Sequence, residues 1–153
     1  GGEYGEAILS RLPIHKIWNH PLPYRVGQEP RTALAVDVGP DDGLPEFLFV
    51  STHLCHQSDA TRSEQTQQLN RIFGGQGGRP VVLAGDLNAR PNSAPMRELF
   101  DAGWIDAVAP QSRIDYVLFR ERDPWKVRKV VIFPDDVTSD HRPVLVVLEW
   151  SAD

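Results

Sequence analysis

The stretch Val81-Val82-Leu83-Ala84-Gly85-Asp86-Leu87-Asn88-Ala89 decides the fold class of this chain. Four apolar residues in a row are typical of a short strand that is buried on both faces. Because a buried strand does not hold an unpaired carboxylate in its middle, Asp86 is expected at the carboxyl end of the strand. Side chains alternate along an extended chain, so Asp86 and Asn88 should point to the same side. The stretch therefore predicts either an acid and an amide at the mouth of a sheet, or a strand followed by an Asx turn.

The composition is that of one globular domain spanning residues 1–153. The chain is 41% hydrophobic and 24% charged, and it contains no apolar run long enough to span a membrane. A single cysteine, Cys55, excludes an internal disulfide and a cysteine zinc cluster, which slightly favours a soluble, cytoplasmic protein. The net charge of −5 provides no global positive field, so a nucleic-acid substrate would need a local basic patch or a metal ion.

Strands dominate the predicted secondary structure. Apolar and alternating segments predict strands at residues 6–11, 32–38, 47–54, 114–120, 126–133 and 143–150. A turn at residues 39–43 would join the second and third of these as a hairpin, and residues 18–30 are expected to form a loop. Helices are expected at residues 59–73, capped by Asp59 and stopped by Gly74, and at about residues 95–102. This order predicts an α+β fold rather than a regular βαβ alternation.

Four more polar residues lie beside the ends of predicted strands, namely His53, Asp115, Asp140 and His141. Taken singly, a surface histidine, an aspartate paired with a neighbouring arginine and a capped turn would each explain them. Together with the acid and amide of the central stretch, they form a set that metal-assisted phosphoester hydrolysis requires. A hard divalent cation prefers carboxylate oxygens, and a water molecule needs a carboxylate to deprotonate it. Imidazolium and amide donors stabilise the charge that develops on the phosphate.

Five short motifs that contain these residues occur in a recognisable order. They are Ala7-Ile8-Leu9-Ser10-Arg11-Leu12-Pro13-Ile14, Ser51-Thr52-His53-Leu54, Gly85-Asp86-Leu87-Asn88-Ala89, Arg113-Ile114-Asp115-Tyr116-Val117 and Ser139-Asp140-His141-Arg142-Pro143. Together they resemble the endonuclease/exonuclease/phosphatase family, which includes pancreatic deoxyribonuclease, apurinic endonucleases, inositol-polyphosphate phosphatases and sphingomyelinases. The resemblance extends from Tyr4 to Trp150. It implies a four-layer α/β/β/α sandwich of the deoxyribonuclease-like type, with the site at one end of the two sheets.

The resemblance also implies a role for each polar residue. Asp86 would orient or deprotonate the attacking water, and Asn88 would hold that water or a phosphate oxygen. His141 would contact the scissile phosphate, with Asp115 bonded to its far nitrogen. Asp140, with Asp86, would bind a divalent metal, Mg²⁺ or Mn²⁺. His53 is similar to the second histidine of the phosphatase-like and deoxyribonuclease-like branches, a general acid or phosphate donor.

The chain departs from the family pattern before the first motif. Relatives carry an Asn after their first strand and a metal-binding Glu, and neither precedes Ala7 here. Glu3 or Glu6 could substitute as a ligand, or could be an exposed acid at a frayed terminus. The fold is therefore expected to be N-terminally incomplete, with an exposed sheet edge along which a second copy pairs.

The function expected from these residues is metal-dependent hydrolysis of a small phosphoester or a phospholipid-type substrate. Arg62 and Arg90 are the arginines expected to face the phosphate. The absence of the family Glu favours instead a catalytically inactive relative that acts as a binding module. A nuclease is a third hypothesis, which the acidic composition makes less favourable because it requires a basic groove beside His141.

Overall fold

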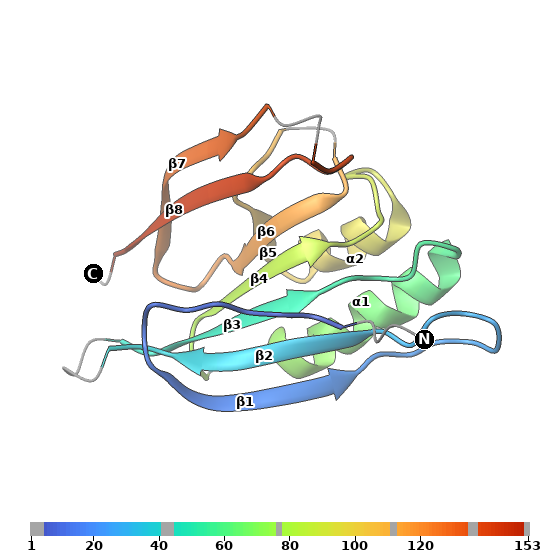
Figure 1. Cartoon of the computed structure of the whole chain (residues 1–153), viewed down its shortest axis with the longest axis horizontal. Helices are drawn as coiled ribbons and strands as arrows, with labels where there is room; N and C mark the ends of the chain where they lie inside the picture. The colour runs from blue at the N-terminus through green and yellow to red at the C-terminus, as the bar shows by residue number, and fades with distance from the viewer. Residues whose placement is uncertain (1–4, 41–44, 76–77, 111–112, 135–137, 152–153) are drawn as a thin grey trace.

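The computed structural model describes residues 5–40, 45–75, 78–110, 113–134 and 138–151, which form two β-sheets and two helices (Figure 1). The larger sheet has the strand order β1 (Ile14–Pro21), β2 (Thr32–Val38), β3 (Phe47–Thr52), β4 (Val81–Asp86), β6 (Asp115–Arg120) and β5 (Trp104–Asp106). The smaller sheet pairs β7 (Trp125–Ile132) with β8 (Val144–Trp150). The helices are α1 (Asp59–Phe73) and α2 (Ala94–Asp101).

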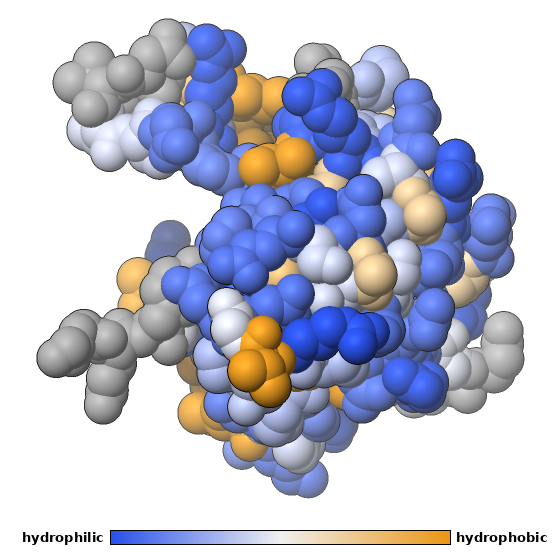
Figure 2. All heavy atoms as spheres, turned by 90° about the vertical axis from the view of Figure 1, so that its right-hand side faces the viewer, coloured by the Kyte–Doolittle hydropathy of each residue, from blue (hydrophilic) through white to orange (hydrophobic). Residues whose placement is uncertain are grey.

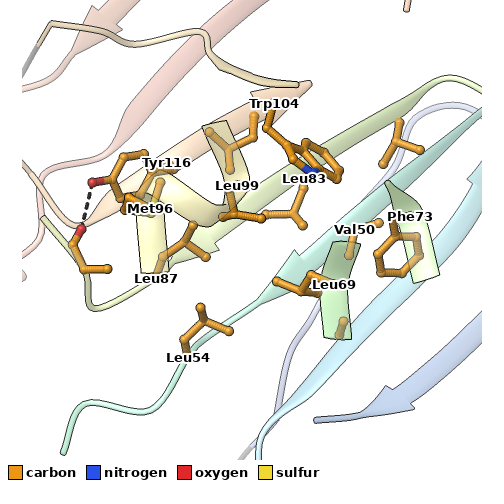
Figure 3. Packing of buried hydrophobic residues seen from close by; sticks show 14 of the residues in the cluster. Val50, Leu54, Leu69, Phe73, Leu83, Leu87, Met96, Leu99, Trp104 and Tyr116 are labelled. Carbon is orange, nitrogen blue, oxygen red and sulfur yellow. Dashed lines mark hydrogen bonds between the residues drawn. The ribbon is translucent and has the colours of Figure 1, made fainter. Parts of the chain in front are cut away.

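The elements stack in layers around two apolar clusters. Both helices lie on one face of the larger sheet, and β7 and β8 lie over part of its other face (Figure 1). The main core lies between the helices and the larger sheet, where Leu69 of α1 and Leu99 of α2 pack with Val50 and Leu83 (Figure 3). A second cluster lies between the two sheets, and it contains Val108, Phe119, Ile132, Val144 and Val146.

The predicted α+β sandwich is confirmed, and the described residues form three of its four expected layers, in the order helices, larger sheet, smaller sheet. On the smaller sheet, Leu145 and Val147 alternate with the residues that face the larger sheet, and they are 43% and 42% exposed. Within the described part of the chain, no helix covers this outer face.

The only parallel pair in the described sheets, β3 with β4, determines where the polar strand ends meet. Parallel neighbours need a crossover connection, and α1 supplies it on the helix-covered face. The carboxyl ends of β3 and β4 therefore reach the same edge of the sheet. Strand β6 runs antiparallel to β4, so it begins at that edge, and its first residue, Asp115, lies opposite Asp86.

Helix α1 has the predicted bounds, but its N-cap is one residue earlier than the sequence suggested. Ser58, rather than Asp59, is the N-cap, and its Oγ accepts a hydrogen bond of 3.3 Å from the Thr61 N–H. Gly74 ends the helix as predicted, and its N–H donates to the Asn70 carbonyl. The second helix begins at Ala94 and ends at Asp101, one residue earlier at each end than the expected range.

Two of the predicted elements need correction, and one strand was missed. Residues 6–11 are not a strand, because no neighbouring strand pairs with them, and Leu9 is 100% exposed. Residues 18–21 are not a loop but the second half of β1, which pairs with β2 at the edge of the sheet. The three-residue strand β5 was not predicted.

The hairpin pairing of β2 with β3 is confirmed, while residues 41–43 of its predicted turn lie outside the described residues. Among the described helices, neither is long and apolar enough to cross a membrane.

Candidate active site

Asp86 and Asp115 face each other where the sheet ends. Asp86 is the last residue of β4, Asp115 is the first residue of β6, and the two are cross-strand partners. Backbone hydrogen bonds between the strands continue just past the two aspartates. The Leu54 N–H donates to the Asp86 carbonyl and the Leu87 N–H donates to the Ile114 carbonyl, both at 2.9 Å. These bonds hold the ends of β3, β4 and β6 together and fix the direction of the two carboxylates.

Gly85 allows this close approach of β3 and β4. Its φ is +149°, a conformation that L side chains rarely adopt. A Cβ at this position would lie 1.8 Å from the Thr52 carbonyl oxygen, so only glycine fits. The approach brings His53, just after β3, to Asp86, with 3.4 Å between His53 Nε2 and Asp86 Oδ2.

His141 joins the site from the segment before β8. Its Nδ1 lies 2.9 Å and 3.0 Å from the two Asp115 carboxylate oxygens, which fixes Nδ1 as the protonated nitrogen. Its Nε2 lies 3.9 Å from Asp86 Oδ2. The hydrogen bond with Asp115 raises the pKa of His141 above its usual value, and this effect outweighs the lowering by partial burial. Asp86 Oδ2 therefore faces ring nitrogens of two histidines.

Asn88 supports Asp86 through a local turn. Its N–H donates to Asp86 Oδ1 at 2.7 Å, and its side-chain Nδ2 donates to the Leu54 carbonyl at 3.0 Å. The φ of Asn88 is +49°, so the chain is no longer extended here. The two alternatives that the sequence left open are therefore both present, because an Asx-type turn positions the acid of the site.

His53 lies in a mixed electrostatic environment. Burial lowers its pKa most, the positive charge of Arg31 lowers it further, and the carboxylates of Asp86, Glu6 and Glu29 act in the opposite direction. The net result favours neutral His53. Glu6 is half-buried and accepts a hydrogen bond of 3.2 Å from Ser51 Oγ, so it is not the exposed acid of a frayed terminus. Glu3 lies outside the described residues.

A divalent cation fits the donor atoms at this edge. Asp86, Asp115 and His141 each offer one ligand atom, and these atoms lie within 4.8 Å of one another. Carboxylate oxygens are the ligands that Mg²⁺ and Mn²⁺ prefer. Asp140 does not belong to this group, but it lines the cavity beside it.

The site opens into a cavity of about 530 Å³, the catalytic cavity, lined by Arg113, Ile114, Asp115, Ile132, Asp140, His141, Arg142 and Val144. Figure 2 views the molecule from the side toward which β3 and β4 run in Figure 1, and most of that face is hydrophilic. Arg113 forms part of the cavity wall, and it is held by an ion pair with Asp106 and by stacking over the Tyr116 ring at 4.9 Å.

The two arginines that the sequence suggested for the phosphate do not line the catalytic cavity. Arg62 on α1 donates to the Cys55 carbonyl at 2.6 Å and pairs with Asp59, and Arg90 is exposed in the segment after β4. Their contact with substrate stays a prediction. Arg113 and Arg142 line the catalytic cavity instead. Both lie inside motifs that contain site residues, and this position in the sequence could have identified them.

The family assignment agrees with this geometry. The model of the endonuclease/exonuclease/phosphatase family matches residues 1–141. The chain belongs to this family. Its members are hydrolases that act on phosphoesters. No curated protein sequence matches the chain at a significant level.

Solved structures of this family share the fold. The chain superposes with a TM-score of 0.79 on a family protein from Bacteroides thetaiotaomicron, at 19% identity, covering 92% of this chain and 66% of that one. The mannosyl-6-phosphatase of Bacteroides thetaiotaomicron VPI-5482 gives 0.75 at 20% identity, covering 91% and 67%. The human Nocturnin catalytic domain with bound sulfate gives 0.74 at 20% identity, covering 92% and 60%. The chain thus spans between 60% and 67% of the length of these three proteins.

Proposed function

We propose that this protein hydrolyses phosphoesters in a metal-dependent reaction, with a small phosphoester or a phospholipid-type compound as substrate. The observation that carries the proposal is the arrangement around Asp86, whose Oδ2 faces Nε2 of both His53 and His141. Family membership supports the reaction class, because the family hydrolyses phosphoesters. The mannosyl-6-phosphatase among the similar structures is one example of a phosphatase with this fold.

In an in-line attack of water on phosphorus, each side chain of the site would have a separate role. Asp86 accepts the proton of the attacking water, and the Asn88 N–H holds the other carboxylate oxygen in place. Protonated His141 donates its Nε2–H to a phosphate oxygen, where negative charge develops. Asp115 keeps the far nitrogen protonated and orients the ring. Neutral His53 has one N–H, which it can donate to the phosphate or to Asp86.

Mg²⁺ or Mn²⁺ would be held by carboxylate oxygens at this edge, where Asp86 and Asp115 offer ligand atoms within 4.8 Å of each other and Asp140 lines the adjoining cavity. The ion would supply positive charge that neutralises the phosphate. Glu6 accepts a hydrogen bond from Ser51 Oγ and acts electrostatically on His53, so its carboxylate would be available near this edge as a further oxygen ligand. The chain's own residues would then bind and orient the phosphoester beside the Asp86 carboxylate.

Hydrolysis of bis-p-nitrophenyl phosphate and of p-nitrophenyl phosphate, each with Mg²⁺ or Mn²⁺, tests the proposal. We expect metal-dependent turnover that Asp86→Asn lowers by at least about 100-fold, because the substitution removes the general base. Asp101→Asn, at the exposed end of α2, is the matched control and should leave turnover unchanged.

Two outcomes would contradict hydrolysis. If Asp86→Asn retains the wild-type rate, the acid is not the base. If no substrate is turned over with either metal, a binding module is the better interpretation, and a single-stranded oligonucleotide substrate in the same assay separates a nuclease from both.

A further inference from the structure

An apolar groove lies between the two sheets and leads to the candidate active site. It has a volume of about 430 Å³, and every side chain that lines it is aliphatic or aromatic, among them Phe49 of β3 and Val146 of β8. We call it the inter-sheet groove. A further cavity of about 390 Å³, the connecting cavity, shares Ala84, Val117 and Val144 with the inter-sheet groove.

The connecting cavity also opens to the active site. Asp115, His141, Arg142 and Val144 line both the connecting cavity and the catalytic cavity. The three hollows therefore form one continuous path, which runs from the carboxylates of the site into the apolar space between the sheets.

The alternation of side chains along the strands of the larger sheet explains this path. On β4, Val82 and Ala84 line the inter-sheet groove, and Asp86 is the next residue on the same face. On β6, Val117 lines the groove, and Asp115 lies two positions before it. This face of the sheet is therefore apolar along the strands and ends in two carboxylates.

Strand β8 has the same order of apolar and polar residues on the opposite side of the groove. Val146 and Leu148 line the groove, and His141 lies before the strand, in contact with Asp115. Both walls of the inter-sheet groove are thus apolar in the middle and polar at the end where the site lies. A molecule with a hydrocarbon chain and a phosphate at one end matches this distribution.

The other end of the inter-sheet groove carries two aromatic rings. Phe47 and Trp125 line it there, in edge-to-face contact with 5.2 Å between ring centroids. Phe47 lies one residue before the pair Leu48 and Val81, so about 20 Å of strand separates its level from that of Asp86. The groove is therefore long enough for an extended aliphatic chain rather than a compact group.

The walls of the groove are accessible to a ligand. Phe47, Phe49, Val144 and Leu148 are only half-buried in the described part of the chain. Covering apolar surface of this kind with hydrocarbon removes it from water, which is favourable and roughly proportional to the area covered. A chain in the groove would therefore add to the affinity with each carbon that it contributes.

We propose that the inter-sheet groove binds the hydrocarbon chain of the substrate, while the phosphate that carries this chain lies at His141. The assignment rests on the proposed function, since it takes that phosphate as the reacting group. The substrate class is then an aliphatic phosphoester with one long chain, which follows β4 from the site toward Trp125. The groove selects for chain length, and the polar end of the site binds the head.

Binding of a homologous series of phosphonates tests the proposal without any turnover. Methyl-, butyl- and octylphosphonate have the same head and no ester bond. In calorimetry with Mg²⁺ present, we expect each added methylene to tighten binding about two- to fourfold, the range for a methylene that is half to fully buried. Equal affinities would overturn the proposal in favour of a polypeptide segment as the occupant of the groove, and no binding of any member would overturn it outright.

Ala84→Leu tests where the chain lies, because Ala84 lines both the connecting cavity and the inter-sheet groove. The larger side chain should keep the affinity for methylphosphonate and remove the increase with chain length. Ala60→Leu is the matched control, since Ala60 is exposed on α1 and lines neither hollow. It should keep the increase. An undiminished increase in Ala84→Leu would contradict binding in the groove.

A fluorescence measurement locates the end of the chain independently of Ala84. The bromine of ω-bromododecylphosphonate should quench tryptophan fluorescence of the wild-type protein, because the chain would end beside Trp125. Trp125→Phe keeps an aromatic ring against Phe47 and should remove most of the quenching. No quenching in the wild-type protein, or the same quenching in Trp125→Phe, would place the chain elsewhere and refute the proposal.

Hydrolysis of methyl p-nitrophenyl phosphate and octyl p-nitrophenyl phosphate, measured in parallel, separates this inference from the proposed function. Turnover of both at equal kcat/KM, with equal phosphonate affinities, sinks the role of the groove and leaves the hydrolase standing. Phosphonate binding that tightens with chain length, without turnover of either ester, sinks the hydrolase and leaves the chain-binding groove standing.

Discussion

Asp115 determines the charge of His141. Both carboxylate oxygens lie within 3.0 Å of Nδ1, so the imidazolium form gains a charge-assisted hydrogen bond that the neutral form lacks. The pKa of His141 is raised for this reason. The protonated histidine then presents Nε2–H toward the side of the site where Asp86 lies.

Asp115→Asn should lower the pKa of His141, because an amide cannot stabilise the imidazolium as a carboxylate does. A raised native pKa stabilises the fold fully below the unfolded value of 6.5, and this contribution is lost as the pH rises through the native pKa. The variant should lose this part of the pH dependence. An NMR titration of the His141 ring measures the pKa, and urea unfolding at several pH values measures the stability.

The control for this titration is Asp101→Asn, which changes an exposed acid on α2. It should leave the His141 titration where it is. The same His141 pKa in Asp115→Asn and in the wild-type protein would show that the carboxylate does not set the charge.

At individual positions, the apolar runs indicated where Asp86 and Asp115 lie, but they did not predict the backbone turn at Asn88. Asp86 and Asp115 were predictable because a buried strand can hold a carboxylate only at its end. The extended-chain argument failed at Asn88, whose positive φ turns its N–H back to Asp86 Oδ1. A left-handed residue depends on tertiary contacts, here with the Leu54 carbonyl, that periodicity does not encode.

Among the secondary-structure elements, one buried ion pair connects three segments. Arg120, at the end of β6, pairs with Asp123 at 2.7 Å and donates to the carbonyls of Phe73 and Arg79 at 2.9 Å and 2.7 Å. Asp123 Oδ2 also accepts from the Val81 N–H at 2.8 Å. The pair thus joins the end of α1 and the segment before β4 to the end of β6.

Asp123→Ala should destabilise the fold by about 3–5 kcal/mol, because it leaves the buried Arg120 charge without its carboxylate. The free energy of unfolding from urea titration, followed by circular dichroism, measures the loss. Glu121→Ala, at an exposed neighbouring position, is the control and should change stability by less than about 0.5 kcal/mol. A loss below about 1 kcal/mol in Asp123→Ala would mean that the pair is not required.

Sequence patterns predicted the elements that have a strong apolar periodicity. They failed for strands that exist only because a neighbouring strand pairs with them. Strand β5 has three residues, too few for a period to be detected. The polar end of β1 is a strand because β2 offers it a partner, and Pro21 is tolerated there at an edge. Residues 6–11 contain a short apolar run but have no partner in the described sheets. Pairing is a tertiary property, so these errors have one cause.

In the whole molecule, the order of strands and helices was sufficient to predict the α+β class, but not to predict how the two sheets pack on each other. The four-layer arrangement came from the family motifs, and three layers appear in the described residues. The site's location at the edge where β3 and β4 end follows from the single parallel pair, which α1 makes possible.

Pairing of a second copy along the exposed edge of β1 stays a prediction. Unpaired N–H and C=O groups of an edge strand are a template for another strand, and Ile17 on β1 is 65% exposed. Light scattering should give twice the mass of one chain. Ile17→Lys should convert the dimer to a monomer, whereas Val26→Lys, at an exposed loop position, should not. A wild-type protein that is strictly monomeric would refute the pairing.

The candidate site combines residues from the larger sheet and from the segment before the smaller sheet, and these two sheets differ in how many of their side chains are buried. Asp86, His53 and Asp115 stand on the larger sheet with its well-buried core, whereas His141 stands on the segment that leads into β8, where few side chains are buried. Local opening costs least where burial is least. If the smaller sheet opened locally in this way, His141 would lose its contact with Asp115 while Asp86 and His53 kept theirs. In the proposed reaction, the fraction of competent molecules would then depend on the packing of the smaller sheet as well as on global unfolding.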